Sequence, residues 1–126
     1  LLMAGALLKK TGVVTIDQTP DAIDWANITA ATQGANANQT ISGIDGSITL
    51  GITYSDGIYG MEYRINSGTY TAILSGGTFS VSNGQTVNFR ATWDGIDIVS
   101  GDVVTITNQS AAGTPTLDTF GVNLTG

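Results

Sequence analysis

Aspartates are the side chains of this sequence best able to bind a metal ion or transfer a proton. Asp94, Asp97 and Asp102 lie near one another beside glycines, and oxygen-rich loops of this kind can bind Ca²⁺. Their spacing does not match the helix–loop–helix calcium pattern, and Asp in such runs commonly forms turns by bonding the local backbone. Asp21 and Asp24 could form the carboxylate pair of a glycosidase, but beside a predicted strand start they are better explained as turn and solvent-facing residues. We therefore predict no catalytic residue, no metal site and no cofactor.

Tyrosine and tryptophan side chains could bind sugars, because a flat ring offers an apolar face to the C–H groups of a pyranose. The alternation of side chains around Trp25 and Trp93 predicts that both are buried. Tyr59 and Tyr70 are the better exposed candidates. These two residues are therefore the predicted ligand-facing aromatics if the protein binds a glycan.

The composition argues against several classes of function. The chain has no Cys and no His, which removes disulfides, thiolate metal sites and the most frequent general base. Its formal net charge is −6, with only four basic residues, so nucleic acid is not an expected partner. No apolar run approaches the roughly 20 residues that cross a bilayer, so we expect no membrane partner. A structural or binding role without enzymatic activity follows.

The 126 residues predict one domain rich in β-structure. Charged residues make up 11%, against about 25% in soluble proteins, and Thr outnumbers even the 17 Gly residues. Three turn signals separate alternating runs: Asp45-Gly46, Asn66-Ser67-Gly68 and Asn83-Gly84. Asn-Gly and Asp-Gly favour two-residue hairpin turns, so residues 80–93 and the pair of runs around Asp45 are predicted to be hairpins.

Eight or nine short strands are predicted, separated by turns at intervals of roughly 8–12 residues, as in an all-β sandwich. Val87, Phe89 and Ala91 share the face expected to be buried, while Arg64 and Arg90 face outward on neighbouring strands, where Glu62 or an Asp could pair with them. The predicted strands are residues 22–28, 39–44, 47–54, 59–65, 69–74, both arms of the 80–93 hairpin, 102–107 and 116–124, with loops at 29–38 and 108–115.

Residues 1–18 are predicted to be an N-terminal arm, and residues 19–126 the sandwich domain. We expect the arm to dock on a neighbouring subunit; the alternatives are a terminal strand or short helix folded on its own domain, or the end of a signal-peptide core. Residues 11–17 read as a strand that could add to another sheet. The predicted assembly residues are Leu1, Leu2, Met3, Leu7, Leu8, Val13, Val14 and Ile16.

Five phrases in order resemble a bacterial and bacteriophage repeat of immunoglobulin-like or fibronectin-III-like fold. They are TPDAIDW (19–25), TISGIDGSITLGI (40–52), EYRINSGTYT (62–71), VSNGQTVNFRAT (81–92) and LDTFGVNL (117–124). The resemblance implies an immunoglobulin-like antiparallel sandwich of seven to nine strands, a module of surface proteins, tail fibres and virion decorations. This chain departs from the family in having one copy, preceded by an apolar arm.

Together, the resemblance and the arm predict a structural protein of a bacteriophage virion, either a head decoration or a tail-associated protein. Its expected partners are capsid or tail subunits, copies of itself, or both. Two alternatives stay open. One is a secreted or cell-surface adhesin that binds host glycans, and the other is a pilus-like filament subunit assembled by strand exchange.

Overall fold

The structure is a computed structural model that describes residues 15–126 apart from 56, 57, 59 and 97. The described chain forms ten strands and no helix. The strands are β2 (Ile28–Ala30), β3 (Gln33–Ala35), β4 (Gln39–Thr40), β5 (Ser47–Thr53), β6 (Gly60–Ile65), β7 (Thr71–Ala72), β8 (Thr78–Ser82), β9 (Thr86–Thr92), β10 (Val99–Asn108) and β11 (Thr116–Leu124).

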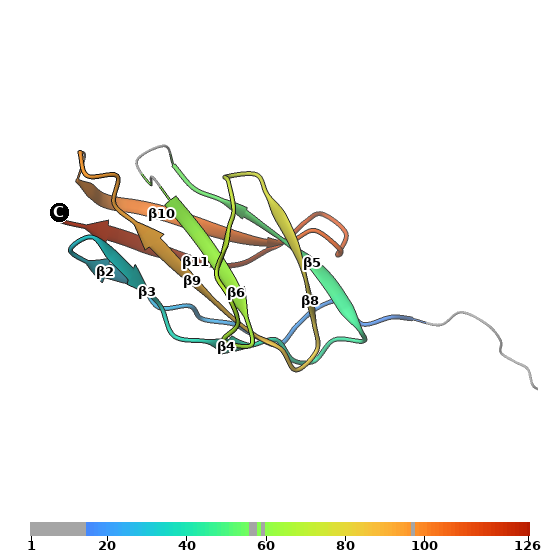
Figure 1. Ribbon diagram of the computed structural model, residues 1–126. Helices are drawn as coiled ribbons and strands as arrows, with labels where there is room; N and C mark the ends of the chain where they lie inside the picture. The colour runs from blue at the N-terminus through green and yellow to red at the C-terminus, as the bar shows by residue number, and fades with distance from the viewer. Residues whose placement is uncertain (1–14, 56–57, 59, 97) are drawn as a thin grey trace, which may run out of the picture.

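The strands form two sheets that pack face to face (Figure 1). One sheet has the order β2-β11-β10-β5-β8; the other has the order β3-β9-β6-β7, with β4 also paired to β9. The predicted all-β sandwich is therefore confirmed. Several of the ten strands are only two or three residues long, and β3 and β4 pair with successive parts of the same strand, β9.

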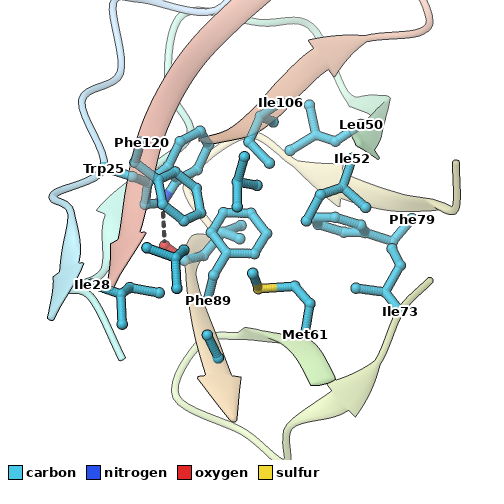
Figure 2. Close-up of a cluster of buried hydrophobic side chains, with 14 of the residues drawn as sticks. Trp25, Ile28, Leu50, Ile52, Met61, Ile73, Phe79, Phe89, Ile106 and Phe120 are labelled. Atoms are coloured by element: carbon cyan, nitrogen blue, oxygen red, sulfur yellow. Dashed lines mark hydrogen bonds between the residues drawn. The ribbon is translucent and has the colours of Figure 1, made fainter. Parts of the chain in front are cut away.

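Aromatic rings from both sheets form the centre of the core (Figure 2). The Phe89 ring lies 5.2 Å from that of Trp25, 5.4 Å from Phe120 and 6.2 Å from Phe79, measured between centroids. Aromatic contacts of this kind stabilise a fold by about 0.5–1.5 kcal/mol each beyond the burial of their area. Val87, Phe89 and Ala91 are buried as predicted.

The predicted hairpin at residues 80–93 is wrong, although both of its strands exist. β8 pairs with β5, whereas β9 pairs with β6 in the other sheet. The Asn83-Gly84 turn crosses between the sheets and bonds the segment before β5: the Gly84 N–H donates to the Ile41 carbonyl at 2.6 Å and the Ile44 N–H donates to Asn83 Oδ1 at 3.2 Å. The turn is therefore bonded to the segment before β5, and the two strands that it connects, β8 and β9, join different sheets.

The predicted hairpin around Asp45-Gly46 is wrong for the same reason, because β4 and β5 belong to different sheets. Of the three turn signals, only Asn66-Ser67-Gly68 closes a hairpin, between β6 and β7. There Asn66 and Ser67 have φ of 55° and 59°, the positive values that a type I′ turn requires at both central positions. The Gly68 N–H donates to the Ile65 carbonyl at 3.0 Å and completes this turn.

The predicted strand at residues 22–28 is also wrong, since only Ile28 of it is in a strand. Residues 22–27 belong to no strand. In place of a backbone bond to a neighbouring strand, the Trp25 N–H donates to a side chain, Asp118 Oδ2, at 2.7 Å. The predicted loop at 29–38 instead contains most of β2 and all of β3. β2 runs parallel to β11, so the sandwich is not purely antiparallel.

Other predicted bounds agree in part. β11 has the predicted bounds, whereas β10 begins three residues early, with an irregular register between Val99 and Asp102. The expected strands at 39–44 and 69–74 reduce to the two-residue strands β4 and β7. Trp25 is buried as predicted, but Trp93 is only partly buried.

Candidate functional site

The N-terminal arm is the first candidate site, and only its end can be described. Ile16 is 59% exposed. Of the predicted assembly residues, Leu1, Leu2, Met3, Leu7, Leu8, Val13 and Val14 lie outside the described residues. Where the arm meets the domain, an apolar side chain therefore faces solvent rather than the core.

The chain is fixed to the sandwich at Asp17 and Gln18. The Asp17 N–H donates to Asp45 Oδ2 at 2.9 Å, and the Asp45 N–H donates to the Asp17 carbonyl at 2.8 Å. The Gln18 carbonyl accepts a bond of 2.6 Å from Nδ2 of the buried Asn108. This anchor lies beside the start of β5, at the end of the sandwich opposite the C-terminus (Figure 1).

Charge is divided unevenly between the arm and the domain. Lys9 and Lys10 are the only charged residues before position 17, so residues 1–14 carry a formal charge of +2. All ten acidic residues follow, against only Arg64 and Arg90, which leaves residues 15–126 at −8. The two parts of the chain therefore carry formal charges of opposite sign.

Tyr70 belongs to a polar network on the outer face of the β3-β9-β6-β7 sheet. Its ring lies 3.9 Å from Cζ of Arg90 and 4.6 Å from Cζ of Arg64, measured to the ring centroid. Both guanidinium groups are in cation–π contact with the ring, which reduces the apolar ring surface left for a sugar. Tyr59, the other predicted ligand-facing residue, lies outside the described residues.

Asn88 lies at the centre of this network and is only 1% exposed. Its Nδ2 donates to the Tyr70 hydroxyl at 2.8 Å and to the Asn36 carbonyl at 3.0 Å, while its Oδ1 accepts from Nε of Arg64 at 2.8 Å. Sequence alternation placed Asn88 on the outward face but gave no sign that it is buried. The expected partner of Arg90 is confirmed: Arg90 Nη2 lies 2.8 Å from Glu62 Oε1.

Two of the aspartates weighed as chemical groups, Asp94 and Asp21, accept hydrogen bonds within the domain. Asp94 Oδ1 accepts a bond from the Ile96 N–H at 2.7 Å, and Asp21 Oδ2 accepts one from the Ser42 hydroxyl at 3.0 Å. Asp97 lies outside the described residues. Within the described ranges, no three acidic residues are close enough to hold a metal ion, and no pocket is present.

The Tyr54 hydroxyl has a shifted acidity. Burial raises the pKa of its hydroxyl above 10.0, because the phenolate is less well solvated than in water. The hydroxyl donates to the Ile73 carbonyl at 2.7 Å, which ties the end of β5 to the chain after β7. This environment indicates a structural tyrosine rather than a proton donor.

No protein-family model matches the chain, and no curated protein matches it. No helix among the described residues is long and apolar enough to cross a membrane. The function is therefore inferred from the geometry of the chain itself.

Proposed function

We propose that this protein is a non-enzymatic structural component of a bacteriophage virion, joined to its particle through the N-terminal arm. Either a head decoration or a tail-associated protein fits this role. The observation that carries the proposal is the end of the arm: Ile16 is 59% exposed immediately before a chain fixed at Asp17. Ile16 continues the apolar sequence of the arm, and a contiguous apolar segment is suited to burial against a partner.

The make-up of the core supports the separation of arm and domain. The hydrophobic core runs from Ile23 to Leu124, and backbone bonds at Asp17 and Gln18 close the domain before it. The core formed by the described residues therefore lies within the predicted domain, which leaves assembly as the proposed role of the arm. The resemblance to repeats of tail fibres and virion decorations suggests the kind of particle.

Removal of the arm tests this proposal. We expect a chain that begins at Thr15 to unfold cooperatively, to be monomeric, and to be absent from purified particles that contain the full chain. Circular dichroism with urea unfolding measures folding, sedimentation velocity measures oligomeric state, and quantitative mass spectrometry of the particles measures incorporation.

A full-length variant with Leu7→Ser and Leu8→Ser separates loss of apolar contact from loss of chain length. It should also be depleted from particles, whereas Lys10→Arg, which keeps the charge, should be incorporated like the parent chain. If the chain beginning at Thr15 enters particles normally, anchoring through the arm is wrong.

The adhesin alternative has weaker support. The Tyr70 ring already contacts the guanidinium groups of Arg64 and Arg90, so a sugar stacked on Tyr70 would have to displace guanidinium groups. Glycan-array binding that is lost in Tyr70→Ala and retained in Tyr70→Phe would favour that alternative over a virion role.

A further inference from the structure

Among the described strands, β8 lies at the edge of its sheet. It pairs with β5 at five consecutive positions, from Ser47↔Ser82 to Gly51↔Thr78, without a register shift. No described strand lies on its other side. Its sequence, TFSVS, contains no charge and no proline, although natural proteins commonly protect edge strands with these residues or with a bulge.

The backbone of β8 presents hydrogen-bonding groups at this edge. Ser82 faces away from β5, because its N–H donates to Gln85 Oε1 at 2.7 Å and its carbonyl accepts from the Gln85 N–H at 3.1 Å. Backbone groups alternate in direction along an antiparallel pair. The N–H and C=O of Thr78 and Ser80 therefore also point away from β5, toward the open edge.

We propose that β8 accepts residues 11–16 of a second copy of this chain as an added strand. This inference rests on the proposed assembly role of the arm and names where and how the arm binds. In β-strand addition, main-chain hydrogen bonds supply affinity and alternate side chains supply fit. The occupant, TGVVTI, is uncharged like β8 and has three β-branched apolar residues, Val13, Val14 and Ile16.

Two features favour a second copy as the source of this strand. Ile16 is 59% exposed and is not part of the core of its own domain. Residues 1–14 are positive and the rest of the chain is strongly negative, so charge favours contact between the arm of one copy and the domain of another. Residues 11–16 join the domain directly at Asp17 and span about 20 Å when extended, which is long enough to pair along all of β8.

The donor and acceptor are different surfaces, so each copy can give one strand and accept another. Such head-to-tail contacts close into a ring or continue as a filament.

Ser80→Pro is the sharpest test of the acceptor edge. Proline removes the outward N–H of Ser80 without removing a bond to β5, and an edge strand tolerates it there. We expect the association constant of the full chain to fall by about 10- to 100-fold, measured by sedimentation velocity. Ser80→Ala keeps the N–H and should associate like the parent chain; matching circular dichroism spectra verify that both variants fold.

Mixing two defective chains provides a complementary test. The chain that begins at Thr15 keeps the acceptor edge and lacks the donor, whereas Ser80→Pro keeps the donor and lacks the edge. Each should be monomeric alone, and their mixture should give a one-to-one heterodimer that grows no further.

Cross-linking gives a result that does not depend on the proline variant. Because the chain has no Cys, a copy with Ser80→Cys can be mixed with copies that carry one Cys at position 13, 14 or 15. Disulfide yield should alternate with a period of two along these positions, as expected for a paired strand.

The outcomes separate this inference from the proposed function. A full chain that stays monomeric, a Ser80→Pro chain that associates normally, or cross-links without alternation each overturns strand addition to β8. Loss of association in Leu74→Ser or Ile96→Ser alone would place the acceptor at the exposed apolar loops instead, again overturning it. If the chain beginning at Thr15 still associates, the arm's assembly role is wrong as well.

Discussion

At the scale of single residues, the most informative side chain is Asn88. It occupies an outward position on β9, yet contacts with Tyr70, Arg64 and Asn36 bury it. A buried polar side chain is tolerated when its hydrogen bonds are satisfied. Asn88 meets this condition with three bonds, and it connects β6, β9 and the chain before β7 without any ligand.

Replacement of this residue should be costly. We expect Asn88→Ala to lower the free energy of unfolding by about 1–3 kcal/mol, because it leaves polar partners without their bonds. Urea unfolding followed by tryptophan fluorescence measures the change. Asn38→Ala, which removes one exposed bond to Ser67, is the matched control and should cost less than about 0.5 kcal/mol. Equal effects of the two changes would show that the Asn88 network is not stabilising.

At the scale of elements, the turns decide which strands become neighbours. Asp45-Gly46 and Asn83-Gly84 both lead from one sheet to the other, while Asn66-Ser67 closes a hairpin. The two crossing turns lie side by side, since the Asn83 N–H donates to the Gly46 carbonyl at 2.9 Å. The two turns are hydrogen-bonded to each other at the end of the sandwich where Asp17 bonds Asp45.

The Asn83-Gly84 turn depends on the conformational freedom of its glycine. Gly84 has φ of 89°, with no atom near the position of an added Cβ, so Gly84→Ala should destabilise through backbone strain alone, by about 1–2 kcal/mol. Gly60→Ala is the control, because Gly60 has no positive φ and its added Cβ would make an ordinary contact at 3.6 Å. Differential scanning calorimetry should show a lower Tm for the first variant only; similar Tm values would refute the strain argument.

At the scale of the whole molecule, the division of charge and the position of the N-terminal end of the domain bear on how two copies could meet. The described chain starts at the end of the sandwich opposite its C-terminus (Figure 1). Residues 1–14 carry a formal charge of +2 and residues 15–126 one of −8, so charges of opposite sign meet in a contact between arm and domain, and charges of like sign in a contact between two domains. Contacts between arm and domain are therefore favoured over contacts between domains.

This charge distribution predicts a dependence on salt. Self-association of the full chain should be weaker at 0.5 M than at 0.05 M NaCl, because salt screens attraction between exposed charges over about a Debye length. Lys9→Gln with Lys10→Gln should weaken association at low salt and reduce its salt dependence, as measured by sedimentation equilibrium. Ser80→Ala is the charge-neutral control. A salt dependence that is unchanged in the lysine variant would rule out this electrostatic contribution.

The sequence alone predicted the properties that depend on neighbouring residues. Alternation with a period of two placed Val87, Phe89 and Ala91 in the core, and it gave the bounds of β11, because a strand's two faces follow directly from its local geometry. Turn chemistry likewise marked the bends at Asp45, Asn66 and Asn83. It could not tell a hairpin from a crossing, since both begin with a similar bend.

Tertiary structure decided which strands pair and which polar groups meet. The Trp25 N–H finds Asp118, 93 residues away, and this bond replaces the strand predicted at 22–28. The parallel pairing of β2 with β11 and the burial of Asn88 also depend on residues remote in sequence. A hydrogen-bond partner is set by which edges and side chains the packed sheets bring within about 3 Å, and no local pattern records that distance.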